Sequence, residues 1–273
     1  LKLKFISTMP KNIDLFPEPT PSFKEIPSWY KKVDSFYNKD SKPYDGSQRL
    51  TVKRCVAFLD ILSSGYMLKV PFDIYIDTTE GKREFQIPKA MESFSALGLK
   101  PMIGSHEMKQ LEGYPIDTDQ YIEFIFRINP IWIVEGEAGV SALFMQPQHQ
   151  ELSPLYAISA IIDIDTYPSD GMLSFLVKKD FKGYISRGTP MIQIVPFKRH
   201  EFVSEIIRDQ EEYNRIKQIA HKVRTVFNSG VKSAICFNAV AFFATGKSPI
   251  CCSNSGIVIL LISIAILKFL YMF

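Results

Sequence analysis

The sequence predicts a mainly β protein, built as a β-sandwich, a jelly roll or a closed barrel, with one amphipathic helix toward its C-terminal end. Short apolar runs recur about every 8–12 residues between positions 119 and 200, with turn-forming residues between them. The chain holds 21 Phe, 12 Tyr and 17 Pro, which favours strands and turns over long helices. Segment 201–227 carries apolar residues at three- and four-residue spacings, as an amphipathic helix does.

The expected strands follow one another in two groups. A meander occupies 51–90, with a Ser-Ser-Gly turn at 63–65 and a hairpin loop at 78–83. A long surface loop, 91–118, separates it from the second group, and loops of this length are often functional. The predicted strands are 66–70, 73–77, 84–87, 121–128, 131–134, 140–145, 156–164, 173–177, 184–186 and 191–197.

The chain is expected to divide into three parts. Residues 1–50 form a Pro-rich N-terminal arm, because Pro17, Pro19, Pro21 and Pro27 suppress regular structure. Residues 51–228 form the β-rich domain, which ends with the helix 201–227. Residues 229–273 form an apolar tail.

The predicted helix has a continuous apolar stripe that includes Ile206, Ile216 and Phe227. We expect this stripe to pack against the sheet, with charged residues such as Glu205 and Arg208 facing water. Asn228, followed by Ser and Gly, is a stop signal.

Charge is distributed unevenly between the main body and the tail. Residues 231–273 hold three lysines and no acidic residue, so the 29 other basic residues match the 29 acidic ones in residues 1–230. The net charge of +3 therefore lies in the tail. Because phosphate binding needs clustered Lys and Arg, this balance argues against a nucleic-acid partner for the main body.

The tail allows three interpretations. Residues 257–273 have only Ser263 and Lys268 as polar residues. At about 1.5 Å per residue they reach about 25 Å, short of the ~30 Å hydrocarbon core of a bilayer. They are a membrane tail anchor, residues not native to the fold, or a buried core helix. We expect a cytoplasmic or virion-associated protein, with membrane anchoring as the alternative.

Cysteine and histidine usage predicts neither a disulfide scaffold nor a metal centre. Cys55 is the one cysteine of the main body, and none of the four His has zinc-like spacing to a cysteine. The expected compartment is reducing, with no structural metal and no cofactor. Residues 1–6 lack the apolar core of a signal peptide, and the chain begins with Leu instead of Met.

Two segments carry the pattern that points to chemistry. The run IIDIDTY at 161–167 leads from an apolar strand into a turn with Asp163, Asp165 and Tyr167, and SRGTPMIQIV follows at 186–195. Paired carboxylates suit catalysis or metal binding, but Asp also caps turns at strand ends. Both interpretations are open at this point.

These two segments resemble motifs of the trimeric dUTPase-type β-folds over residues 130–197. The resemblance implies a dUTPase-like barrel, with Asp163 holding the sugar and orienting water and Tyr167 approximating the ring that stacks on the base. Here one extra residue separates Tyr167 from Asp163, segment 137–141 lacks the family's phosphate-binding Arg, and the Gly-rich C-terminal arm is missing.

Four other residues are weaker candidates for ligand binding. His106 and Gln110 lie in the long loop, where a ligand or solvent would surround them. Trp132 suits core anchoring or ligand stacking. Gln193 is a polar residue at the centre of an apolar strand.

The chain from 1 to 228 also resembles an uncharacterised family carried by tailed phages and related genomes. The segments that carry this resemblance are 26–31 (IPSWYK), 53–60, 63–66 (SSGY), 129–133 (NPIWI), 141–147, 162–165 (IDID), 188–193 and 196–199. It departs at 135–139, where a Thr-Pro-type turn is expected. The resemblance implies a viral β-rich protein without an established activity.

The sequence therefore favours a virus-associated, non-enzymatic structural or interaction protein with a protein partner or self-assembly. The alternative is a nucleotide-binding or nucleotide-hydrolysing protein of dUTPase-like fold. The membrane is a partner only if residues 257–273 are a genuine anchor.

Overall fold

The computed structural model describes residues 1–9, 14–37, 49–89, 91–92, 101–150, 154–168 and 172–228. The chain forms two compact units. The first consists of Leu1–Asp34 and Ala57–His200 and holds most of the strands. The second consists of Ser35–Val56 and Glu201–Phe273. The predicted apolar tail, from residue 229 onward, lies outside the described residues.

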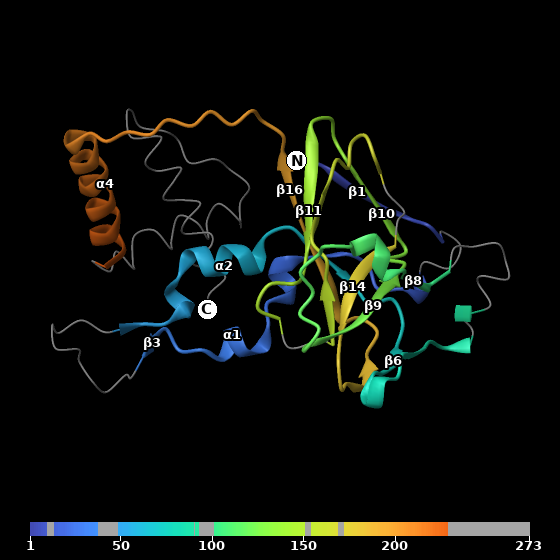
Figure 1. Ribbon diagram of the computed structural model, residues 1–273. Helices are drawn as coiled ribbons and strands as arrows, with labels where there is room; N and C mark the ends of the chain where they lie inside the picture. The colour runs from blue at the N-terminus through green and yellow to red at the C-terminus, as the bar shows by residue number, and fades with distance from the viewer. Residues whose placement is uncertain are drawn as a thin grey trace. The chain divides into compact units, whose positions relative to one another are not determined.

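Strands dominate the first unit (Figure 1). Its strands are β1 (Leu3–Ser7), β2 (Thr20–Pro21), β5 (Tyr66–Lys69), β6 (Ile74–Asp77), β7 (Glu84–Gln86), β8 (Ile103–His106), β9 (Tyr121–Ile128), β10 (Trp132–Gly136), β11 (Val140–Met145), β12 (Leu155–Ala157), β13 (Ala160–Ile162), β14 (Leu173–Lys178), β15 (Lys182–Ile185) and β16 (Pro190–Lys198). Its helices are α1 (Ser28–Lys32) and α2 (Val56–Ser63, of which Val56 belongs to the second unit), with 3₁₀ turns η2 (Ser22–Glu25), η4 (Thr79–Gly81) and η5 (Met108–Leu111). The prediction of a mainly β protein is confirmed.

The strands form several antiparallel sheets. One sheet has the order β13-β11-β16-β5-β2, and another has the order β12-β14-β9-β8. A three-stranded sheet, β15-β6-β7, and the pair β1-β10 complete the first unit. Within the described part of the chain these sheets have open edges, so its strands do not form the closed barrel that was one of the predicted architectures.

Both large sheets contribute to the same core. Ala142 and Ile194 from the five-stranded sheet and Phe126 and Phe175 from the four-stranded sheet are at most 1% exposed and belong to one apolar cluster. Side chains alternate along a strand, so the intervening residues lie on the opposite face of each sheet. Each buried Ile or Phe contributes about 1.5–3 kcal/mol to stability.

The predicted turn at 63–65 is shorter, because Ser63 is the last residue of α2, and the bend at 64–65 depends on its glycine. Gly65 has φ of +72°, which L-residues other than Gly rarely adopt. A Cβ atom on Gly65 would lie 1.8 Å from the carbonyl oxygen of Ile194. The backbone of the bend after α2 therefore lies against the backbone of β16.

The N-terminal segment differs from the extended arm that its prolines predict. Strand β1 pairs with β10, and β2 pairs with β5. Phe16 and Tyr30 are 4% and 1% exposed. Prolines exclude long strands but permit short edge strands, which explains the short β2. Residues up to Asp34 thus belong to the first unit instead of forming a separate arm.

Part of the predicted surface loop 91–118 is also regular. Strand β8 lies within it and pairs with β9, and η5 follows. The pairing of β8 is non-local, which explains why its short, weakly apolar sequence did not predict a strand.

The second unit contains β3 (Phe36–Tyr37), β4 (Arg49–Leu50), the 3₁₀ turn η3 (Val52–Arg54) and helix α4 (Gln210–Asn228). The predicted start of the helix at residue 201 is wrong. Asp209 accepts a hydrogen bond from the backbone N–H of Glu212 at 2.8 Å, so it caps a helix that begins one residue later. Residues 201–209 are not helical, and Ile206 is 82% exposed.

On helix α4, Tyr213, Ile216 and Ile219 are 58%, 50% and 47% exposed. The side chain of Phe227, which the predicted stripe includes, lies outside the described residues. No helix in the described ranges has both the length and the apolar character required to cross a membrane.

Candidate functional site

Strand register places the Asp163–Asp165 turn beside the ends of two other strands. Strand β13 pairs with β11, with Ala142 opposite Ile162, and the turn begins directly after β13. The Asp163 carbonyl oxygen accepts hydrogen bonds from the backbone N–H groups of Thr166 and Tyr167, at 3.1 and 2.8 Å. These two backbone hydrogen bonds close the turn that follows β13.

Arg199, just beyond the end of β16, lies between the two carboxylates. Its Nη1 and Nη2 donate to Asp165 Oδ1 and Oδ2 at 2.8 and 2.6 Å, a bidentate pair. Nη1 also lies 3.2 Å from Asp163 Oδ1 and donates to Ser141 Oγ at 3.0 Å. We call Ser141, Asp163, Asp165 and Arg199 the arginine cluster.

The two carboxylates of the arginine cluster differ in exposure. The side chain of Asp165 is 8% exposed, and its Oδ2 also accepts from the backbone N–H of Gly139 at 2.7 Å. The side chain of Asp163 is 55% exposed, and its Oδ1 accepts from Ser141 Oγ at 2.5 Å. The Arg199 guanidinium, aided by the Gly139 N–H, holds the pKa of Asp165 well below its ordinary value. Asp165 correspondingly raises the pKa of Arg199.

The structure thus brings Asp163 and Asp165 together, as their spacing predicts, but not the Tyr167 ring. Tyr167 is 67% exposed, and the hydrogen bond from its backbone N–H serves to close the turn. Arg199 and Ser141 were not predicted as site residues. Arg199 could have been noticed as a basic residue just after the last apolar strand. No local pattern, however, links it to Asp165, which lies 34 residues earlier.

Gln193 is buried and engaged within the fold. It is 0% exposed, and its Nε2 donates to the carbonyl oxygens of Ile61 and Ser64 at 2.7 and 2.9 Å. Its Oε1 accepts from the backbone N–H of Gln148 at 3.1 Å. The amide therefore satisfies the C-terminal end of α2 instead of facing a ligand.

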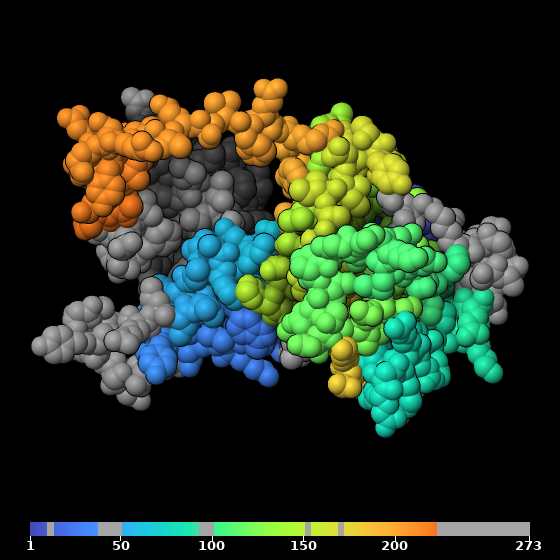
Figure 2. All heavy atoms as spheres, in the orientation of Figure 1, coloured from blue at the N-terminus to red at the C-terminus, as the bar shows by residue number. Residues whose placement is uncertain are grey.

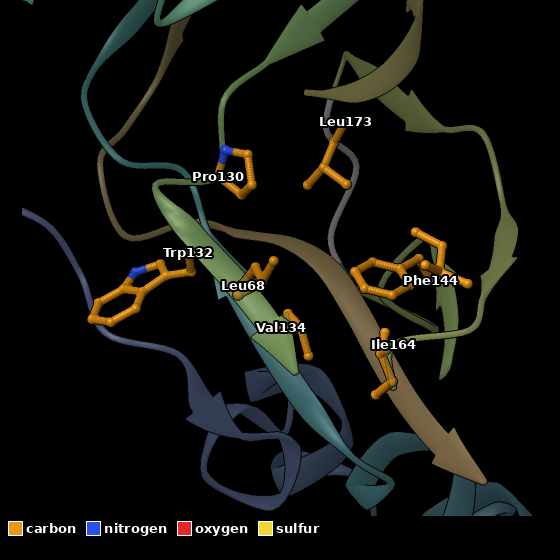
Figure 3. A pocket seen from close by; sticks show the side chains of 8 residues that line it. Leu68, Pro130, Trp132, Val134, Phe144, Ile164 and Leu173 are labelled. Atoms are coloured by element: carbon orange, nitrogen blue, oxygen red, sulfur yellow. The ribbon is translucent and has the colours of Figure 1, made fainter. Parts of the chain in front are cut away.

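Trp132 lies at an apolar cavity (Figure 3). Its indole N–H donates to the carbonyl oxygen of Pro17 at 3.1 Å. The cavity volume is about 20 Å³, the space of a single water molecule. The lining side chains are Leu68, Pro130, Trp132, Val134, Phe144, Ile162, Ile164 and Leu173. An apolar space of this size suits imperfect core packing better than a bound ligand.

His106 and Gln110 belong to other elements than the residues of the arginine cluster. His106 is on β8, which is the edge of the four-stranded sheet opposite β12. Gln110 is exposed in η5. The hydrogen bonds of the arginine cluster involve neither residue.

A second charged cluster, not predicted from the sequence, centres on the Asp77 carboxylate at the end of β6. The side chain of Asp77 is 3% exposed, and its Oδ1 accepts from the Thr79 hydroxyl at 2.6 Å. Lys182 and Lys82 lie 3.4 and 3.7 Å from its Oδ2. The Thr79 hydrogen bonds, with the two ammonium groups, lower the pKa of Asp77 to about 2. Asp77 thus joins β6 to β15 and to η4.

Metal-binding groups do not gather elsewhere in the described ranges. No three His, Cys, Asp or Glu side chains there are placed to hold an ion.

Comparisons of the chain with protein-family models, with curated proteins and with solved structures find no match.

Proposed function

We propose that this chain is a non-enzymatic β-sandwich protein that acts by binding proteins, either other copies of itself or a partner. The core shared by the two large sheets supports the sandwich architecture. The resemblance to a phage-borne family extends the proposal to a virus-associated protein. Exposed apolar side chains on strands, among them Tyr156, Ile161 and Tyr184, offer contact area for a partner.

The observation that carries the proposal is the structural use of the two candidate catalytic carboxylates. Both oxygens of Asp165 accept hydrogen bonds from Arg199, and Oδ2 accepts one more from Gly139. Asp163 is held through its Oδ1 by Ser141 and Arg199. A carboxylate that activates water or binds a metal needs an oxygen free for that partner, and at Asp165 both oxygens are already engaged. Here the cluster instead joins the 163–167 turn to β11 and to the end of β16.

The test is a hydrolysis assay of the full chain with the deoxynucleoside and ribonucleoside triphosphates and Mg²⁺. The matched control is Asp163→Asn, which removes the more exposed carboxylate. We expect no turnover above that of the control. Hydrolysis by the natural chain that Asp163→Asn abolishes would overturn the proposal, since shared contaminants would remain in both preparations.

A second candidate function is nucleotide binding, as the dUTPase resemblance implies. One observation favours it. Segment 137–141 contains no Arg of its own, but Arg199 Nη1 lies 3.0 Å from the Oγ of Ser141 in that segment. A bound phosphate would compete with Asp165 for the guanidinium, because both Nη atoms already donate to that carboxylate.

Thermal melting distinguishes the two functions. A nucleotide at 100 times its Kd stabilises a protein by about 2.7 kcal/mol. Nucleotide binding predicts a rise in Tm with dUTP that Arg199→Gln removes, whereas the interaction proposal predicts no rise in either chain.

A further inference from the structure

Strand β13 is an open edge of the five-stranded sheet. It pairs on one side with β11 and has no neighbour on the other among the described strands. Ile161, its central residue, is 64% exposed. In Figure 2 the yellow-green to yellow spheres around β13 lie on the surface of the face shown.

The hydrogen-bond register shows which groups of this edge point outward. The backbone N–H of Arg199 donates to the Gly139 carbonyl oxygen, so the odd-numbered residues of β11 bond to β16. The even-numbered residues, Ala142 and Phe144, then bond to Ile162 and Ala160 of β13. The N–H and C=O of Ile161 therefore point away from β11, toward the open side.

The side chain of Ile161 continues an apolar row on the outer face. Ile161 lies opposite Leu143, which lies opposite Val195 on β16. Both neighbours are only partly buried. The edge strand, Ala160–Ile162, carries no charge and no proline, the residues with which monomeric proteins block sheet edges.

We propose that β13 pairs antiparallel with β13 of a second copy of the chain, about a two-fold axis at Ile161. This inference rests on the proposed function as a protein-binding module and names its partner. An antiparallel pair about Ile161 lets the two Ile161 residues exchange both hydrogen bonds, with Cα atoms about 5.5 Å apart. The rows of Val195, Leu143 and Ile161 from both copies then form one continuous apolar stripe.

The charges beside the edge favour this register and a partner identical to the chain. Antiparallel pairing about Ile161 sets Asp163 opposite Ser159 of the second copy, two residues to either side of the axis. The two Asp163 carboxylates therefore stay apart, and each keeps its own Arg199 at 3.2 Å. A self-complementary edge of this kind is typical of a two-fold interface, and its short length predicts a weak, concentration-dependent dimer.

Sedimentation of the full chain over a range of concentrations tests the pairing. We expect a monomer–dimer equilibrium that Ile161→Lys weakens at least tenfold, because two ammonium groups would meet at the axis. The matched control is Leu15→Lys, which we expect to leave the equilibrium unchanged. Leu15 is 54% exposed and precedes β2, the opposite edge strand of the same sheet. Equal melting temperatures of the three chains establish that the substitutions leave the fold intact.

Cysteine cross-linking tests the axis directly. In a background with Cys55, Cys236, Cys251 and Cys252 replaced by Ser, Ile161→Cys should give a covalent dimer with a short thiol-specific cross-linking reagent, because the two Cα atoms lie about 5.5 Å apart. Ser159→Cys, displaced from the axis, should cross-link far less. A monomer at all concentrations, or a dimer that Ile161→Lys leaves intact and Ile161→Cys does not link, overturns the inference. Because these readouts involve no nucleotide, they fail independently of the hydrolysis assay.

Discussion

Gln193 and Arg199 lie six residues apart on and just beyond the same strand, β16, and hold neighbouring segments by different means. Gln193 is fully buried and neutral, and its amide joins the end of α2 and the Gln148 backbone to the sheet. The side chain of Arg199 is 37% exposed and charged, and it joins the 163–167 turn to the sheet through two carboxylates.

The difference follows from the solvent around each residue. A charge at the fully buried position of Gln193 would carry a large desolvation cost, whereas a neutral amide needs only its hydrogen bonds. At the rim of the sheet, water lowers the desolvation cost of the Arg199 guanidinium. It also screens the attraction between Arg199 and the two carboxylates. The two positions should therefore differ in how strongly they stabilise the fold and in their response to salt and pH.

Gln193→Leu should produce the largest effect. The substitution leaves two carbonyl oxygens and one N–H without their partner, and each unsatisfied buried group costs about 1–3 kcal/mol. We expect a loss of about 3–5 kcal/mol in the free energy of unfolding, measured by urea denaturation. The control, Gln110→Leu at an exposed position, should change it by less than about 0.5 kcal/mol. A loss below about 1 kcal/mol at Gln193 would show that its hydrogen bonds are replaceable.

Arg199→Gln should lower Tm by less, and the loss should depend on salt. At low ionic strength the variant leaves Asp163 and Asp165 without their cation. At 1 M NaCl the Debye length is about 3 Å, so the natural chain also loses part of the attraction and the difference in Tm should shrink. The exposed Arg187 provides the control Arg187→Gln, with little change at either salt concentration. A salt-independent loss would mean that Arg199 acts through packing instead of charge.

Acid should remove the contribution of Asp165. Its folded-state pKa is lowered by Arg199 and Gly139, so it stabilises the fold above the unfolded value of about 3.9 and loses this effect as pH falls further. The Tm difference between the natural chain and Asp165→Asn should be widest near pH 7 and should narrow below about pH 4. Asp77, with a pKa of about 2, titrates in the natural chain and in Asp165→Asn alike, so it does not change the Tm difference between them. The Gln193→Leu difference should show no such change.

The strands of this fold are largely predictable, because a half-buried strand carries its pattern locally. The predicted runs 121–128 and 140–145 coincide with β9 and β11. The predicted strand 156–164 is instead two strands, since β12 pairs with β14 and β13 pairs with β11. Continuous apolar sequence does not reveal that the chain changes sheets.

The candidate site was predictable only in part, for the same reason. Asp163 and Asp165 follow an apolar strand, and that position is visible in the sequence. Their partner Arg199 and the enclosed surroundings of Gln193 depend on tertiary contacts, over 34 residues in one case and over 132 residues, to Ile61, in the other. Residue type alone marked the Asp163–Asp165 turn and Gln193 as candidate sites. Their burial and their hydrogen-bond partners show that these side chains stabilise the fold.

Tyr167→Ala should have the smallest effect and separates the two candidate functions most cleanly. The Tyr167 side chain is 67% exposed, and the hydrogen bond that closes the turn comes from its backbone N–H, which alanine keeps. We therefore expect a change of less than about 0.5 kcal/mol in the free energy of unfolding. Tyr156→Ala, at a residue 43% exposed on β12, is the control for loss of an exposed aromatic side chain.

If the chain bound nucleotides as the dUTPase resemblance implies, dUTP would raise the Tm of the natural chain. Tyr167→Ala would then remove this rise and Tyr156→Ala would keep it, since base–aromatic stacking is worth about 1–3 kcal/mol. With no rise in the natural chain and none in either variant, Tyr167 is a surface residue of a turn that the arginine cluster holds in place.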